Sequence, residues 1–287
     1  MIVLQAAISG ALLGGLFALM AIGLSLTWGM LKVINLAHFG LIILSAYLSY
    51  ELATGLGIDP ILTIALTVPV GAALGAGLQW AVHVFRISEF SSLLASFGAL
   101  IVIVQMISNH WGADFRRMEA AVNLYATQSV PLGPLVFPTP TLLAFGFAVL
   151  IVAAGQAILA RTMTGRALRA FAQDRQIAAA FGIDHERLSI LLAAASGATA
   201  AIAGMLFALQ DALTPTTPFE WIGIVFAVVI LGGIGNVVGT LLAGSLVGAI
   251  SGVVSVLWSP ATAPFVVFLA IVLALLFRPR GLFGSPA

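Results

Sequence analysis

Two short segments, one in each half of the chain, combine an asparagine with residues that can interrupt a helix. Residues 33–40 read Val-Ile-Asn-Leu-Ala-His-Phe-Gly, and residues 231–239 read Leu-Gly-Gly-Ile-Gly-Asn-Val-Val-Gly. Where a helix is broken inside a membrane, its freed backbone groups and half-helix dipoles can bind a polar solute. We therefore expect recognition of a small solute here, and the residues predicted to line its path are Asn35, His38, Gly40, Gly232, Gly233, Gly235 and Asn236.

Asn35 and His38 also have a simpler interpretation, because they follow closely on Lys32. A polar residue within a membrane is a candidate functional residue by default. At the membrane surface, however, the same two residues would merely cap a helix. The sequence leaves both interpretations open.

Catalytic chemistry finds no support in the sequence. Lys32 is the only lysine, and no Gly-x-x-x-x-Gly-Lys-Ser/Thr loop is present, so a P-loop ATP site is excluded. The chain has no cysteine, and its four histidines are too scattered to give the ligand spacing of a metal site. The sequence thus predicts no enzyme, no cofactor and no metal site, and any ATP hydrolysis must take place in another subunit.

The scarcity of charge predicts the elements that position these residues. Of 287 residues, 11 are Lys or Arg and 10 are Asp or Glu, which is 7%, while 61% are hydrophobic. A soluble domain has about 25% charged residues, so a soluble fold and a disordered chain are both excluded. A net charge of +1 does not fit a nucleic-acid-binding surface. The chain is predicted to be an integral membrane protein.

Runs without charge locate the membrane spans, because a helix needs about 20 apolar residues to cross the hydrocarbon core. The runs do not alternate as barrel strands do. We therefore expect an all-α polytopic helix bundle that forms a single domain, residues 1–287. The charge-free runs are residues 1–31, 33–50, 60–85, 90–113, 120–160, 188–210 and 221–277.

The arginines fix the expected topology, because Lys and Arg in short loops favour the cytoplasmic side. As one helix, residues 221–277 would be about 85 Å long, so three crossings are expected there, with breaks at the glycines of 232–239 and at Ser259–Pro264. The total is nine crossings, or eight if one short piece re-enters. The N-terminus is then outside, the C-terminus is cytoplasmic, and residues 110–140 form an external loop.

Glycines recur at four-residue spacing, which permits close contact between membrane helices. This pattern predicts a tightly packed bundle and says nothing about the solute. The residues are Gly10 and Gly14, Gly71 and Gly75, and Gly244, Gly248 and Gly252.

Four carboxylates fall at the expected external ends of spans: Glu51, Asp59, Asp211 and Glu220. They could bind the ammonium group of a solute or an extracytoplasmic protein. They could equally be solvated loop ends, whose ion pairs contribute little.

Residues 161–187 hold eight of the charged residues. Apolar residues recur between these charges at helical spacing, and Gly182 suits the position just after a helix end. One or two short amphipathic helices on the cytoplasmic face are expected, resting on anionic lipid or docking a soluble partner. The apolar residues are Ala167, Leu168, Phe171, Ala172, Ile177, Ala178 and Phe181.

The stretch GRALRAFAQDRQIAAAFGID, Gly165 to Asp184, resembles the cytoplasmic loop of ABC importer permeases for branched-chain amino acids. Gly15 to Gly40 is similar to the start of the LivH-type subunit of that family. Phe226 to Gly244 and the C-terminal RPRGLFG, Arg278 to Gly284, resemble its end. The resemblance covers nearly the whole chain in the right order.

The resemblance implies a permease subunit in a bacterial cytoplasmic (inner) membrane that moves substrate by alternating access. It implies two ABC ATPase subunits, a second LivM-like permease subunit and an extracytoplasmic substrate-binding protein as partners, besides membrane lipid and without nucleic acid. It also favours ATPase docking over lipid contact for residues 161–187. The residues that it implies in coupling are Gly165, Arg166, Arg169, Asp174, Arg175, Ala179 and Gly182.

This chain departs from the family at one position: His38-Phe39-Gly40-Leu41 lacks the acidic residue that usually follows His-Gly. No role of that carboxylate carries over. Two alternatives remain, a permease of the same family for another small polar solute such as urea, and an ion-coupled secondary transporter. The second usually carries ionisable residues within its spans, whereas here nearly all charges fall in loops.

Overall fold

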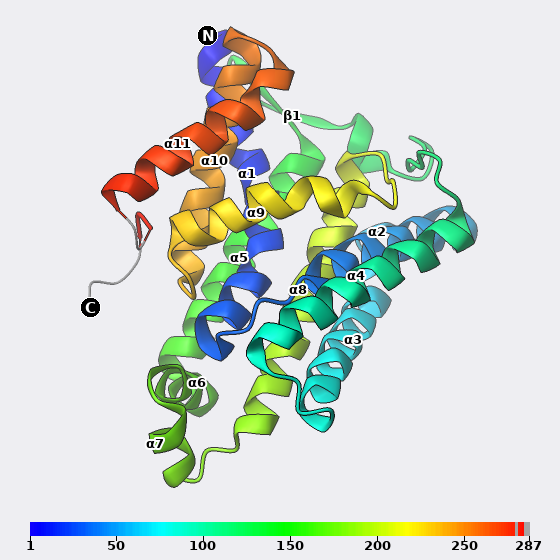
Figure 1. The fold of residues 1–287 in the computed structure, drawn as a ribbon. Helices are drawn as coiled ribbons and strands as arrows, with labels where there is room; N and C mark the ends of the chain where they lie inside the picture. The colour runs from blue at the N-terminus through cyan, green and yellow to red at the C-terminus, as the bar shows by residue number, and fades with distance from the viewer. Residues whose placement is uncertain (279–280, 284–287) are drawn as a thin grey trace.

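The protein is a bundle of α-helices in a computed structural model that describes residues 1–278 and 281–283 (Figure 1). Pro279, Arg280 and Gly284 of the C-terminal motif lie outside the described residues. The helices are α1 (Ile2–Leu31), α2 (Ala37–Leu56), α3 (Ile64–Val84), α4 (Glu89–Trp111), α5 (Thr139–Arg161), α6 (Met163–Gln173), α7 (Arg175–Ala180), α8 (His185–Gln210), α9 (Thr217–Gly232), α10 (Val237–Leu257) and α11 (Ala263–Phe277), with 3₁₀ turns η1 (Leu124–Thr127) and η2 (Pro260–Thr262).

Eight helices in the described part of the chain are long and apolar enough to cross a membrane: α1, α2, α3, α4, α5, α8, α10, and α11 together with η2. The expectation of an all-α polytopic bundle is confirmed. Helix α9 is apolar but has only 16 residues, about 24 Å, against a hydrocarbon core of about 30 Å. The expected totals of eight and nine crossings therefore differ only in whether α9 is counted as a crossing.

The two ends of the bundle differ. One end carries an antiparallel hairpin of β1 (Ser129–Leu132) and β2 (Leu135–Pro138), and the N-terminus lies beside it (Figure 1). We call this the hairpin end. The opposite end carries α6 and α7 with their arginines, and we call it the basic end.

Glycines bring α1 and α10 into direct contact along antiparallel paths. A Cβ added to Gly14 would lie 2.7 Å from the Gly244 carbonyl carbon, and one added to Gly10 would lie 3.0 Å from that of Gly248. Gly71 of α3 meets Gly197 of α8 in the same way. The predicted close packing at these glycines is confirmed, because only a residue without a side chain lets two helix backbones approach so closely.

The helices differ in how much protein surrounds them. Helices α1 and α8 are the most buried of the long helices, whereas only 17% of the span residues of α4, α5 and α11 are buried, which leaves part of their surface exposed. That exposed surface is apolar, for example at Leu150 of α5 and Leu276 of α11. Such a surface is suited to lipid or to another membrane subunit.

Candidate functional sites

Residues 33–36 lie in the connection between α1 and α2, residues 37–40 form the first turn of α2, and hydrogen bonds fix the segment. The Asn35 side-chain oxygen accepts from the backbone N–H of Ala37 at 3.1 Å, and the Leu36 N–H donates to the Ser96 hydroxyl of α4 at 3.1 Å. Asn35 also lines a cavity of about 210 Å³ between α3 and α4. Gly40 is buried against Leu100 and Ile103 of α4.

His38 lies inside the bundle, with 1% of its surface exposed. One ring nitrogen, Nε2, lies 2.9 Å from the carbonyl oxygen of Met20 in α1, and Nδ1 lies 3.1 Å from the Ser196 hydroxyl of α8. The side chain therefore ties α1, α2 and α8 together. This interior position does not fit the interpretation of His38 as a helix cap at the membrane surface.

Residues 231–239 comprise the end of α9, the turn 233–236 and the start of α10. Gly233 and Gly235 have φ angles of 86° and 85°, a left-handed conformation that glycine adopts without strain. Asn236 caps α10 by accepting from the Gly239 N–H at 2.9 Å and donates to the Phe283 carbonyl at 2.7 Å. Gly232 is buried against the backbone of Thr240.

Helix α1 lies between these two connections. Its Gly23 faces His38, whereas its Ser25 hydroxyl accepts from the Gly235 N–H at 3.0 Å. Positions 23 and 25 point to nearly opposite sides of a helix, because each residue advances the helix by about 100°. The structure thus places the two predicted path segments on opposite faces of α1.

A cavity of about 420 Å³ opens at the hairpin end between α1, α8 and α9. Its inner wall includes Met20, Phe207 and Trp221, and the rings of Phe207 and Trp221 meet edge to face at 4.4 Å. Phe115 closes one side, next to Arg116, whose backbone pairs with Leu213 in a short bridge.

The rim of this cavity is polar. Asp211 follows the last residue of α8, and Glu220 lies in the first turn of α9. Between them the hydroxyls of Thr214 and Thr217 lie 2.6 Å apart. Burial raises the pKa of Asp211 above its usual value, and the positive charge of Arg117 opposes that shift.

The sequence indicated the two carboxylates of this rim separately but not the aromatic wall. The only available signal was that Asp211 and Glu220 bracket a short connection rich in Thr and Pro.

Residues 161–187 form two short helices, α6 and α7, at the basic end. Gly165 packs against the backbone of the last turn of α5, and the Arg169 guanidinium donates to the Leu159 carbonyl. Asp174 caps α7 by accepting from the backbone N–H groups of Gln176 at 2.8 Å and Ile177 at 2.9 Å. These contacts hold the segment in a fixed shape.

The outer face of this segment is partly apolar. Ile177 and Phe181, two of the apolar residues that recur at helical spacing, are 58% and 83% exposed. Helix α7 ends at Ala180, and Gly182, with a φ of 80°, then reverses the chain. The use of Gly182 just after the helix end is as predicted. Arg166 and Ala179 are exposed as well.

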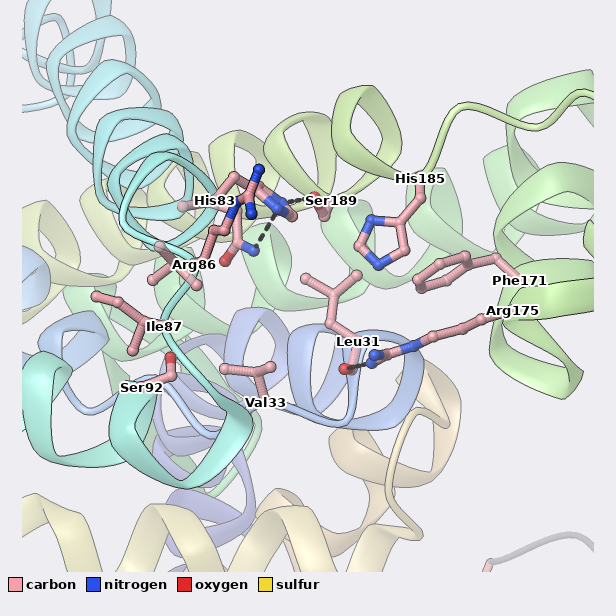
Figure 2. A pocket seen from close by; sticks show the side chains of 12 residues that line it. Leu31, Val33, His83, Arg86, Ile87, Ser92, Phe171, Arg175, His185 and Ser189 are labelled. Carbon is pink, nitrogen blue, oxygen red and sulfur yellow. Dashed lines mark hydrogen bonds between the residues drawn. The ribbon is translucent and has the colours of Figure 1, made fainter. Parts of the chain in front are cut away.

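A third cavity, of about 310 Å³, lies where α6 and α7 meet the membrane helices (Figure 2). The Arg175 guanidinium donates to the Leu31 carbonyl at the end of α1 and lies 5.3 Å over the Phe171 ring. Phe171 in turn meets His185 of α8 edge to face at 4.8 Å. Only Arg175 among these was predicted as a functional residue.

The other side of this cavity is formed by α3 and α8. His83 Nε2 of α3 lies 2.5 Å from the Ser189 hydroxyl of α8, and the rings of His83 and His185 lie 5.5 Å apart. Figure 2 shows these side chains converging on the cavity from α3, α6, α7 and α8. The α6–α7 segment is therefore in contact with the ends of several membrane helices at once.

A bundle with eight long apolar helices in the described part of the chain has the architecture of a multi-pass membrane protein. The chain belongs to the family described as branched-chain amino acid transport system / permease component, which matches residues 6–276. The family resemblance found in the sequence is confirmed.

The chain is similar over 99% of its length to high-affinity branched-chain amino acid transport system permease proteins. It is 28% identical over 300 residues to LivH of Escherichia coli (strain K12), and 27% identical over 300 residues to LivH of Salmonella typhimurium (strain LT2), with 96% of each relative covered. It is 26% identical over 305 residues to BraD of Pseudomonas aeruginosa, again with 96% of that protein covered. No solved structure matches the chain.

Proposed function

We propose that this chain is a permease subunit of an ABC importer that moves branched-chain or related amino acids by alternating access. Membership of a permease family supports the transport role. The observation that carries the ABC mechanism is the α6–α7 segment, which is braced against α1 and α8 and presents exposed Ile177 and Phe181 to a partner.

In this proposal the basic end faces the cytoplasm, and the hairpin end and the N-terminus face outside. The arginines at the basic end support this orientation, because cytoplasmic loops carry an excess of Lys and Arg. The hairpin and its flanking loop are then available to a substrate-binding protein, and the exposed faces of α4, α5 and α11 to lipid or a second permease subunit.

Movement of α6 and α7 by partner ATPases would reach the bundle through two contacts. The bond from Arg175 to the Leu31 carbonyl pulls on the end of α1. The Phe171 and His185 rings transmit the same motion to α8. Because α1 and α8 also line the cavity at the hairpin end, closing one end and opening the other is a change in the packing of the same two helices.

The test is import by the reconstituted complex of this chain with its ATPases, permease partner and binding protein. Wild type should import leucine only with ATP. The double variant Ile177→Ser, Phe181→Ser should lose at least about tenfold in import rate, since exposed apolar anchors contribute about 1.4 kcal/mol or more to an interface.

The matched control is Phe85→Ser, which changes a 73% exposed phenylalanine at the end of α3, outside the α6–α7 segment. It should import at the wild-type rate. Import driven by an ion gradient without ATP, or equal import by the double variant and wild type, would overturn the proposal.

A further inference from the structure

The cavity at the hairpin end joins a negative rim to an apolar wall. The residues that line it include two carboxylates, Asp211 and Glu220, and no Lys, Arg or His. The remaining wall is mostly Leu, Phe, Met and Trp side chains. A volume of about 420 Å³ lies in the range of small-molecule sites, which combine an apolar lining with a few convergent polar groups.

Each part of the cavity selects for a chemical group. The rim carries two carboxylates against one positive charge, that of Arg117, which acts on Asp211, so it attracts the ammonium group of an amino acid more strongly than the carboxylate. Both carboxylates are exposed at the mouth of the cavity, where an incoming cation can reach them. The Phe207 and Trp221 rings are nearly fully buried below the rim and offer contact to an apolar side chain.

We propose that this cavity binds a small apolar amino acid, with its ammonium group at Asp211 and Glu220 and its side chain against Phe207 and Trp221. The proposal rests on the proposed function, since it names where the transported amino acid meets the permease from outside. Urea, which has neither a charge nor an apolar side chain, would use neither part of the cavity.

The inner boundary of the cavity is held by a residue that does not line it. Met20 forms part of the wall, and the carbonyl oxygen of Met20 lies 2.9 Å from His38 Nε2. His38 also contacts Ser196 of α8, so it holds α1 against α8 at the depth where the cavity ends. His38 is thus a positioning residue for this site and does not contact the amino acid.

The absence of cysteine makes the cavity directly testable. A cysteine placed by Ala212→Cys, in the cavity lining, is the only thiol in this chain. Its rate of modification by an uncharged thiol reagent is measured in the assembled importer in vesicles without ATP. Leucine at about ten times its Kd should slow labelling about tenfold. Isopentylamine, which is leucine without the carboxylate, should also protect. The analogue 4-methylpentanoate, which is leucine without the ammonium group, should not.

The variants Asp211→Asn and Glu220→Gln, singly and together, test the carboxylates on the same background. The double variant should need at least about tenfold more leucine for equal protection, and each single variant should need an intermediate amount. The control is Glu51→Gln, a carboxylate of α2 that accepts from the Trp111 indole N–H at 3.0 Å and does not line this cavity. It should leave protection unchanged.

Equal protection by 4-methylpentanoate, or unchanged protection in the double variant, would overturn the cavity proposal. So would an absence of leucine protection while the same vesicles import leucine with ATP. Protection without ATP-driven import would instead contradict the proposed function and support the cavity as an amine site.

Discussion

Replacing Gly14 of α1 by alanine tests whether direct helix contact holds α1 to α10. A Cβ at Gly14 would lie 2.7 Å from the Gly244 carbonyl carbon and 2.8 Å from the Ser245 Cα, with the Gly244 oxygen nearer still. All three are backbone atoms, so no side-chain rotation can relieve the overlap. Helix α10 must therefore move away from α1.

The size of the effect follows from that displacement. Ordinary contact begins at 3.4 Å, so the helices must separate by about 0.7 Å or more at this level. A gap of about 0.5–1 Å forfeits a quarter to a half of each dispersion contact, and overpacking a close-packed interior costs about 1–3 kcal/mol. For a loss of about 2 kcal/mol, the apparent Tm should fall by roughly 4–8 °C.

Thermal unfolding of the purified chain in detergent, at one fixed scan rate because such unfolding is often irreversible, measures this shift. The matched control is Gly77→Ala in α3, where an added Cβ meets nothing within 4 Å. That substitution should keep or raise the Tm, since alanine favours a helix by about 1 kcal/mol over glycine. In the Gly14→Ala background, Gly244→Ala should lower the Tm by less than it does in the wild type, because the first substitution has already separated the two helices. A Gly14→Ala protein as stable as Gly77→Ala would refute the contact.

Three further predictions concern the sites. Gly182→Pro should lower import by at least about tenfold without loss of membrane insertion, because proline cannot adopt a φ of 80°. Arg169→Glu, which loses the hydrogen bond to the Leu159 carbonyl, should also lower import. Import by both variants at the wild-type rate would contradict coupling through α6 and α7. His38→Ala should lower the free energy of unfolding by about 1–3 kcal/mol, since it leaves buried partners on α1 and α8 unpaired; an unchanged Tm would count against its bracing role. Leucine should protect the cavity fully above the raised pKa of Asp211, and protection should weaken as the pH falls through that pKa, because protonation removes the negative charge. Asp211→Asn should show a smaller pH dependence of protection. An identical pH profile would exclude a role of Asp211 in binding the ammonium group.

The features that the sequence predicted well are those with a local cause. Gly182 after α7 and the break at Gly233 and Gly235 follow from the left-handed backbone that glycine tolerates. The two short helices at the basic end follow from apolar spacing, and the division into spans follows from the positions of the charges. Each of these features is determined by residues that lie close to it in the sequence.

The features that the sequence did not predict depend on distant partners. His38 contacts residues 18 and 158 positions away, and a hydrogen bond to a helix carbonyl leaves no pattern in the sequence. The aromatic wall of the hairpin-end cavity joins α8 to α9 through packing, which spacing alone does not specify.

The pairing of α1 with α10 also has a consequence for how the protein is made. Gly14 and Gly244 are 230 residues apart in the chain (244 minus 14). At a synthesis rate of about 5–20 residues per second, roughly 12–46 s pass between the appearance of one and the other. Throughout that interval the glycine face of α1 stands in the bilayer without the helix that covers it in the finished protein. Helix α1 is thus made long before α10, and it gains this large contact only after most of the other helices have been synthesised.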